Sequence, residues 1–332
     1  MALFEDIYRW ENKKVLIIGE ALIDKYIFGF ADKISPDAPV PNVKIEKSNS
    51  YLGGIGLVLK YIKSLGGIPE ICTIVGNDYE GDFFLKEIKS LNLNSSGIIV
   101  DDKINTPQIT RVKAMNQHLL RLETDYSNNI SKSTIEDFFK IFESRPKKYD
   151  SIIVLDYGIG GLFEDIFIQR LLVYLEENYK NIPIIARPNL ANYYLYENIE
   201  IIKMTLQKAL QTLSIDCCTP TSVTIVGKKI LNASNCKNVL LNDIESKSYL
   251  FSKDSEKLIE INTILQGPVT SYVAVGSVIM AILGLGYAAK ISAFNTAKIA
   301  IYAASLSASL PPVDFLNSEN LLNFIQTCLD KE

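Results

Sequence analysis

Short apolar runs alternate along the chain with segments in which apolar residues recur at helical spacing. The runs predict buried strands, and they lie within 15–18, 71–76, 96–100, 149–161 and 182–186. The segments with helical spacing occupy residues 57–67, 78–92, 134–145 and 167–181. This alternation is typical of βαβ units with right-handed crossovers. The pattern therefore predicts an α/β fold with a mostly parallel sheet.

The longest apolar segment covers residues 264–289, and no acidic residue occurs between Glu260 and Asp314. Two interpretations are open, because about 18 apolar residues can cross a bilayer and a helix buried on all sides has the same composition. The surrounding βα pattern favours the helix buried inside a large domain, since an isolated span here would interrupt that pattern. A membrane partner is therefore not expected.

Composition excludes several classes of partner and site. The 332 residues have 48% hydrophobic content and a net charge of -4, with no basic block that would indicate nucleic acid. The N-terminal residues contain early acids and no long apolar run, so no secretory signal is expected. Five cysteines without CxxC spacing favour reduced thiols and a cytoplasmic location. His118 is the only histidine, which excludes a His-rich metal site.

Polar and glycine positions near the first strand are candidates for ligand binding. Asp24 follows the apolar run 15–18, near the sheet edge where α/β proteins bind ligands, although a turn or helix cap is the other interpretation. Gly53 and Gly54 open a predicted helix. The intervening segment alternates and contains three prolines, which favours edge strands or a flap. Residues 106–126 also alternate, and we expect them to pair with this flap.

Four motifs in order resemble the ribokinase or PfkB family of sugar kinases, and most closely its heptose 7-phosphate kinase branch. They are GEALIDKY with Asp24, KISPDAPVPNVKIE at 33–46, NQHLLRLE at 116–123, and DYGIGG at 156–161. The resemblance implies a ribokinase-like three-layer α/β sandwich formed as one domain over residues 1–332. It also implies a β-lid inserted from about 26–52 and 105–125, which commonly forms a dimer interface.

The same resemblance implies where a sugar would bind. Asp24, Gly53, Gly54 and Asp156 match the sugar-facing positions of the family. On the lid segment, Arg111 and Arg121 are candidates for a phosphate on the sugar, because guanidinium groups suit phosphate geometry. The other interpretation of both arginines is a lid salt bridge or a solvated charge.

Several positions depart from the family pattern. Leu57 stands where an asparagine normally contacts the sugar, and Ile159 replaces the lysine of DYGKG. After the strand at 182–186 the family has Asp-Pro-Lys, whereas this chain has Arg-Pro-Asn at 187–189. Thr205 and Lys208 occupy the Asn and Glu positions of a motif near the phosphate and magnesium site. A lysine there would repel Mg²⁺.

The nucleotide side of the pattern is also altered. Residues 240–251 lack the glycine of the nucleotide-binding turn. The final Gly-Ala-Gly-Asp motif should supply an anion hole and the catalytic base, and its positions hold Thr270, Ser271, Tyr272 and Val273. Losing a general base costs on the order of a hundredfold to ten-thousandfold in rate. No catalytic residue or metal ligand is therefore predicted, and Val273 occupies the base position.

Two functions follow. The first is a degenerate sugar kinase that binds a sugar, a sugar phosphate or an active kinase partner, as a homodimer or heterodimer through its lid. The second is an ATP-dependent carbohydrate kinase for a heptose phosphate or related sugar, with Mg-ATP as cofactor and a base from an unrecognised position such as Tyr272. The combined loss of base, metal acid and nucleotide glycine favours the first.

Overall fold

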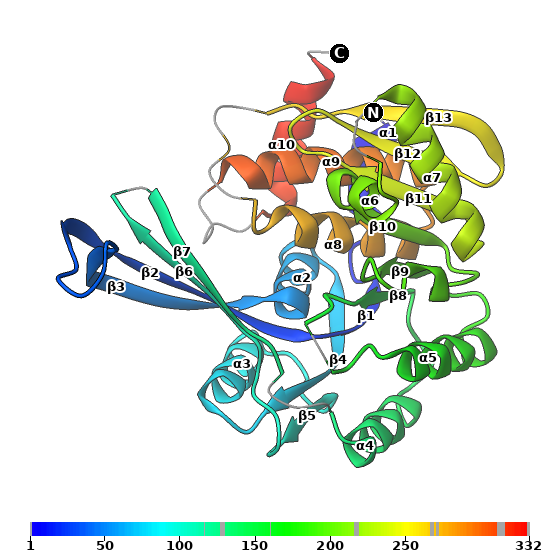
Figure 1. Cartoon of the computed structure of the whole chain (residues 1–332). Coiled ribbons are helices and arrows are strands. Elements are labelled where there is room, and N and C mark those ends of the chain that lie inside the picture. Colours follow the sequence, from blue (N-terminus) through cyan, green and yellow to red (C-terminus); the bar gives the residue numbers. More distant parts are fainter. Residues whose placement is uncertain are drawn as a thin grey trace.

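The structure is a computed structural model that describes residues 2–115, 117–126, 130–159, 161–215, 219–265, 269, 272–310 and 316–330. Its main sheet has the strand order β13-β12-β11-β10-β9-β8-β1-β4-β5 (Figure 1). The strands from β11 to β5 are parallel, and β12 and β13 are antiparallel additions at one edge. Their bounds are β1 (Lys14–Gly19), β4 (Ile68–Gly76), β5 (Ile98–Asp101), β8 (Ser151–Leu155), β9 (Ile184–Arg187), β10 (Ile201–Thr205), β11 (Asn238–Asn242), β12 (Lys247–Ser252) and β13 (Ser255–Asn262).

Helices cover both faces of this sheet and enclose two separate apolar cores. One face is covered by α1 (Ala2–Tyr8), α2 (Gly54–Ser64), α3 (Tyr79–Ser90), α8 (Val275–Ala288), α9 (Ala293–Ser309) and α10 (Ser318–Leu329). The other face is covered by α4 (Lys132–Glu143), α5 (Asp165–Asn178), α6 (Leu206–Thr212) and α7 (Pro220–Ser234), with the short 3₁₀ helix η1 (Tyr193–Leu195). Strands buried from both sides explain the continuous apolar runs of the sequence. The predicted three-layer α/β fold is confirmed.

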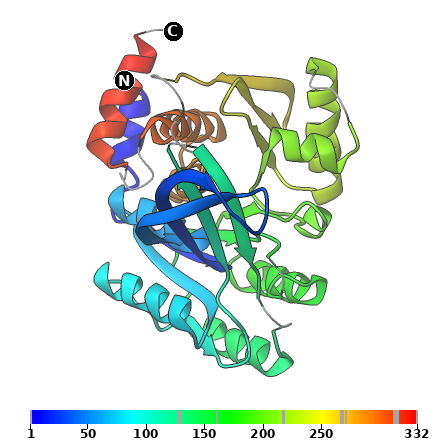
Figure 2. The same cartoon turned by 60° about the vertical axis from the view of Figure 1, so that its left-hand side comes forward.

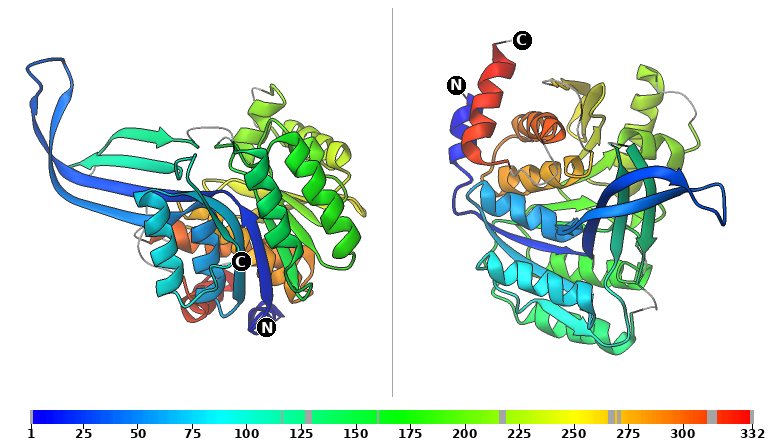
Figure 3. Two further views of the ribbon diagram at one scale, coloured as in Figure 1. Left: turned by 90° about the horizontal axis from the view of Figure 1, so that it is seen from below. Right: turned by 90° about the vertical axis from the view of Figure 1, so that its left-hand side faces the viewer.

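A second sheet forms the lid and has the order β3-β2-β6-β7. Its strands are β2 (Ala21–Ile34), β3 (Pro41–Gly53), β6 (Gln108–Ala114) and β7 (Gln117–Thr124). β2 pairs antiparallel with β3 and parallel with β6, so the two segments predicted to pair do so. In Figure 2 the lid points toward the viewer, and Figure 3 shows its long β2-β3 hairpin extending beyond the body. The turn between Ile34 and Pro41, which contains Pro36 and Pro39, forms the tip of this hairpin.

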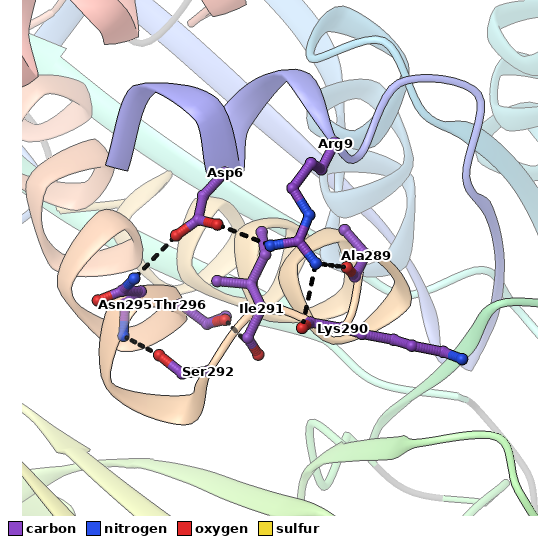
Figure 4. A network of polar contacts seen from close by, with 8 residues as sticks. All are labelled: Asp6, Arg9, Ala289, Lys290, Ile291, Ser292, Asn295 and Thr296. Atoms are coloured by element: carbon purple, nitrogen blue, oxygen red, sulfur yellow. Dashed lines mark hydrogen bonds and ion pairs between the residues drawn. The ribbon is translucent and has the colours of Figure 1, made fainter. Parts of the chain in front are cut away.

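Helix α8 lies at the centre of the first core, and nearly all of its residues are buried. Small residues let it approach the sheet: a Cβ on Gly284 would lie 2.5 Å from the Ile153 side chain of β8. At the other end of α8, Arg9, which directly follows α1, donates to the carbonyl oxygens of Ala289 and Lys290, at 2.9 and 3.4 Å (Figure 4). Asp6 accepts from Arg9 and from Asn295 of α9, which ties α1 to the α8–α9 turn.

The apolar segment 264–289 is shorter as a helix than its composition suggested. Within it α8 has 14 residues, and Ile264 and Leu265 precede it without regular structure. Among the described residues, none of the helices combines the length and the apolar character that crossing a bilayer would require. Of the two interpretations of this segment, the structure therefore agrees with the buried helix.

Candidate functional site

Polar residues gather where the parallel strands end. Glu20 directly follows β1, Asp156 follows β8, Arg187 ends β9 and Thr205 ends β10. The loop after β11 and the first turn of α8 face the same edge and line one cavity with Arg187 and Thr205. Parallel strands deliver side chains from distant parts of the sequence to one edge, which is where open α/β sheets bind ligands. The lid sheet begins at this edge.

Asp24 lies inside strand β2, so its interpretation as a turn or helix cap is wrong. The strand begins at Ala21, only two residues after β1 ends, which leaves no loop for Asp24 to cap. The buried Asp24 carboxylate forms an ion pair with the buried guanidinium of Arg111 on β6. Arg111 also lies 5.4 Å from the centre of the Tyr26 ring. The lid salt bridge considered for Arg111 is thus present in this structure.

The two glycines Gly53 and Gly54 pack closely against Asp24 and Glu20, respectively. A Cβ on Gly53 would lie 2.4 Å from the Asp24 carboxylate, so only glycine allows this approach. Gly54 has φ +50, and a Cβ there would be 3.0 Å from the Glu20 carbonyl oxygen. Leu57, at the position where the family pattern expects asparagine, is buried in the core of α2 and offers no polar atom to this pocket.

Asp156 is buried at the carboxyl end of β8, and neighbouring hydrogen-bond donors hold its side chain in place. Its carboxylate accepts from the Tyr196 hydroxyl and the Gly158 amide, both at 3.0 Å. Burial raises the pKa of Asp156, and these hydrogen bonds oppose the rise. Ile159, in place of the family's lysine, packs against the second core. Asp156 therefore supports the loop after β8 as well as bordering the site.

Glu20 was not recognised from sequence, although it is 1% exposed at the centre of the edge. One carboxylate oxygen accepts from the Tyr157 amide at 2.7 Å, and the other has no hydrogen-bond partner among the described residues. Burial and the nearby charge of Asp156 raise the pKa of Glu20 to about 8. The side chain is therefore mostly uncharged at neutral pH.

Tyr157 joins the lid side of the site to the start of α8. Its ring would contact a Cβ at Gly54, and its hydroxyl hydrogen bonds to Ser277 in the first turn of α8. The Arg187 guanidinium lies 4.2 Å from the ring centre and donates to the Asp156 carbonyl oxygen at 3.0 Å. These contacts hold Arg187 over the wall of a cavity of about 430 Å³.

Lys203 is the least expected member of the site. It lies in β10 with 2% of its surface exposed and lines the same cavity as Arg187 and the start of α8. Burial, Arg187 and Lys208 together lower the pKa of Lys203 to about 7. A lysine inside the apolar run IEIIKMT is the sequence signal that could have drawn attention to it.

Lys208 and Arg121 extend this positive region toward the lid. Lys208, in α6, borders a smaller cavity of about 60 Å³ together with Arg187, Lys203 and Thr205. Burial and the charges of Arg187 and Arg121 lower the pKa of Lys208. Arg121 itself forms an ion pair with Glu123 on the exposed face of β7. Arg121 is also the strand partner of Arg111, so it lies between the residues around Asp24 and Lys208, on whose pKa its charge acts.

The predicted anion-hole positions are only partly described. Thr270 and Ser271 lie outside the described residues. Tyr272 and Val273 line the cavity beside the first turn of α8, and the exposed Tyr272 hydroxyl donates to Glu245. The hydrogen bond to Glu245 raises the pKa of Tyr272, so the hydroxyl stays protonated at neutral pH and is not available as a base. Val273 supplies no titratable group. His118 lies exposed on β7 of the lid.

Acidic side chains are few around this cavity, which limits how the protein could hold a magnesium ion there. Within the described ranges, no cluster of three or more His, Cys, Asp or Glu side chains could hold a metal. Arg187, Lys203 and Lys208 converge instead, and these cations would repel a divalent ion. Asp243 and Glu245 line the outer part of the cavity without a third acidic partner there.

The geometry can now be compared with known proteins. Residues 12–146 match the pfkB family carbohydrate kinases. This part of the chain thus carries the pattern of that family. The match covers β1, the lid and the strands up to β5, which hold every sugar-facing position predicted except Asp156. The predicted family is therefore confirmed.

Curated relatives share the predicted branch. The bifunctional protein HldE of Desulfatibacillum aliphaticivorans is 26% identical over 301 residues, covering 91% of this chain and 60% of that protein. The bifunctional protein HldE of Sulfurimonas denitrificans is 30% identical over 203 residues, covering 61% of this chain and 42% of that protein. The chain thus spans about half of the length of these relatives.

Solved structures confirm the fold. Phosphofructokinase-2 of Escherichia coli in complex with fructose-6-phosphate has a TM-score of 0.74 at 14% identity, covering 96% of this chain and 99% of that one. Ribokinase of Arabidopsis thaliana complexed with ribose and ATP has a TM-score of 0.74 at 13% identity, covering 95% and 99%. At this identity the likeness concerns the ribokinase-like fold alone.

Proposed function

We propose that this chain is a sugar-kinase-like protein that binds a sugar or sugar phosphate and has lost, or greatly weakened, phosphotransfer. The observation that carries this proposal is the charge at the nucleotide side of the site. Arg187 and Lys203 line the cavity where metal-bound phosphates would need acidic ligands, Lys208 borders the smaller cavity beside it, and Val273 stands at the expected base position. Phosphoryl transfer depends on positioning and charge stabilisation, so removing both metal and base affects the whole reaction.

The proposed sugar site lies under the lid, between Asp24, Gly53, Gly54 and the loop that begins at Asp156. Its substrate class is a heptose phosphate or a related sugar phosphate, which is supported by the HldE relatives. Asp24 would accept sugar hydroxyl groups, and Arg111 beside it would face a phosphate once the sugar displaces part of their ion pair. The proposed location is the cytoplasm.

The lid supports a further part of the proposal, a dimer. On the face of the lid opposite Asp24, strand register places five apolar side chains in one stripe: Ile27, Ile45, Val112, Leu120 and Leu122. Of these, Ile45, Leu120 and Leu122 are exposed, and Ile27 and Val112 are half-buried. An exposed apolar patch of this kind marks a protein contact surface. A second copy of the chain, or an active kinase relative, would cover it.

A direct assay tests the loss of phosphotransfer. With Mg-ATP and heptose 7-phosphate, we expect ADP release at least on the order of a hundredfold slower than in the D. aliphaticivorans relative, as loss of a general base predicts. Calorimetry with heptose 7-phosphate should show binding, and the D24N variant should weaken it about tenfold or more. Turnover similar to that of the relative would overturn the proposal.

One observation favours the second function, an active ATP-dependent kinase that uses non-standard residues. Asp243 and Glu245 line the cavity beside α8, and Glu245 is linked to Tyr272. In that case one of these carboxylates would take the proton from the sugar hydroxyl. If turnover is found, D243N or E245Q should abolish it, whereas neither variant should affect the binding of the sugar phosphate.

A further inference from the structure

The amine of Lys203 borders two cavities and has no partner of opposite charge. The side chain is buried, yet it lines both the cavity of about 430 Å³ and the smaller one of about 60 Å³. Its Nζ lies 3.7 Å from the point where a Cβ on Gly276 would stand, so the amine reaches the first turn of α8. Within the described part of the chain, Nζ forms no hydrogen bond or ion pair. A buried charge without a partner is costly, so this position does not favour an ammonium ion.

The charges around Lys203 favour the uncharged amine. Burial has the largest effect, and the nearby cations Arg187 and Lys208 act in the same direction, which lowers the pKa of Lys203 to about 7. Roughly half of these amines are then uncharged at neutral pH, compared with about one in a few thousand for an ordinary lysine. Only the uncharged amine is a nucleophile, and burial beside another cation is a way in which proteins activate lysine.

The carboxylates that border the two cavities have other partners. Asp156 accepts a hydrogen bond from the Tyr196 hydroxyl, and Glu245 accepts one from the Tyr272 hydroxyl. The charges that act on Lys203 are all positive. These acids therefore do not restore the ammonium ion.

Tyr157 connects the proposed sugar site to the cavity of Lys203. A Cβ on Gly54 would lie 3.5 Å from the Tyr157 ring, and the Tyr157 hydroxyl is hydrogen-bonded to Ser277 in the first turn of α8. Tyr157, Ser277 and Lys203 line the same cavity. A sugar held beside Gly54 would therefore meet this cavity at the Tyr157 ring.

We propose that Lys203 is a covalent binding site for an aldehyde, and that it forms a reversible imine with C1 of an open-chain aldose phosphate. Nζ attacks the carbonyl carbon, and one N–H proton passes to the carbonyl oxygen. The resulting carbinolamine loses its hydroxyl group and the second N–H proton as water, which leaves a C=N double bond. This imine is uncharged, so the cations Arg187 and Lys208 do not oppose it as they oppose the ammonium ion.

The choice of aldehyde rests on the proposed function, whereas the reactivity of the amine does not. In heptose 7-phosphate the phosphate and the aldehyde carbon are at opposite ends of the chain. A phosphate facing Arg111 therefore leaves C1 to turn toward Tyr157 and the cavity beyond it.

Reductive trapping followed by peptide mapping tests the proposal. The full chain is incubated at pH 7 with sodium cyanoborohydride and with either glyceraldehyde or heptose 7-phosphate. We expect Lys203 to be modified at least about tenfold faster than Lys229, an exposed lysine of α7 in the same sample, because far more of its amine is uncharged. The K203R variant keeps a cation but forms no imine at neutral pH. It should lose the rapid adduct and keep the slow one on Lys229.

The peptide map of the unaltered protein decides the question even if K203R does not fold. Modification of Lys203 that is no faster than that of Lys229 with both aldehydes overturns the proposal. Rapid trapping of glyceraldehyde on Lys203, with no calorimetric binding of heptose 7-phosphate, supports the imine site and overturns the proposed sugar ligand. Calorimetric binding of heptose 7-phosphate without any rapid adduct on Lys203 supports the proposed ligand and overturns this inference.

Discussion

At the scale of single residues, burial controls the charges of this site. Glu20 directly follows β1 and Lys203 lies in the middle of β10, and both are nearly inaccessible to water. Desolvation moves each pKa toward the neutral form, to about 8 for Glu20 and to about 7 for Lys203. A carboxyl group that stays protonated next to Asp156 avoids repulsion between two buried negative charges. Residue identity alone would have suggested two ordinary charges.

The E20Q variant tests the charge of Glu20. Because the pKa of Glu20 rises from 4.5 in the unfolded chain to about 8 in the folded protein, its contribution to stability is complete below pH 4.5 and is lost as the pH rises through 8. Glutamine keeps an acceptor for the Tyr157 amide and cannot ionise. We expect E20Q to remove a decline in the free energy of unfolding on the order of 4 kcal/mol between pH 5 and 9.

Urea denaturation at several pH values measures this difference. The control is D150N, because the Asp150 carboxylate also accepts a hydrogen bond from a backbone amide, that of Lys14, but is not buried. An identical pH profile for E20Q and the unaltered protein would show that Glu20 is charged in the folded state.

At the scale of elements, α8 links the core to the site. Arg9, just after α1, holds its C-terminal end, its middle packs on β8 through Gly284, and its first turn borders the cavity. The lid also connects the core to the site. Strand β2 begins directly after the carboxyl end of β1, a central strand of the main sheet, and carries Asp24 near its start. Each of these elements connects a packed interior to a candidate ligand position.

Two glycines of α8 give a matched pair of variants. In G284A the new Cβ would lie 2.5 Å from the Ile153 side chain, so we expect a loss of about 1–3 kcal/mol in the free energy of unfolding from overpacking. In G276A the nearest atom is the Lys203 Nζ at 3.7 Å, and alanine favours the helix by up to about 1 kcal/mol. The midpoint of thermal denaturation should therefore fall in G284A and rise in G276A. A G284A protein as stable as the unaltered one would contradict the tight packing of α8.

At the scale of the whole molecule, the lid separates two surfaces. The face with Asp24 and Arg111 turns toward the proposed sugar site, and the opposite face exposes the apolar stripe that includes Leu120 and Leu122, each about half exposed. The β2-β3 hairpin extends away from the body (Figure 3), so the stripe can be reached by another molecule. This separation supports a lid that both closes a site and forms an interface.

Sedimentation of the purified protein tests the interface. We expect a dimer at micromolar concentration, and we expect the double variant L120D/L122D to sediment as a monomer, because two carboxylates cannot be buried in an apolar contact. The control I166D changes an exposed apolar residue on α5, far from the lid in sequence and in a different layer. A monomeric unaltered protein that also fails to bind an active HldE relative would exclude the lid interface.

The sequence by itself determined the α/β fold, the family and the lid, because strand and helix periodicities and the motifs around Asp24 depend on neighbours along the chain. It also showed what stands at the positions of the missing motifs, such as Val273 and Lys208. Only the tertiary structure revealed that Lys203 and Glu20 share one buried edge, and that Arg111 pairs with Asp24. Burial, and the charges that meet there, arise from strands that are distant in sequence and adjacent in the sheet. For that reason the sequence indicated the altered charge at Lys208, but the buried Lys203 beside it could be recognised only from the fold.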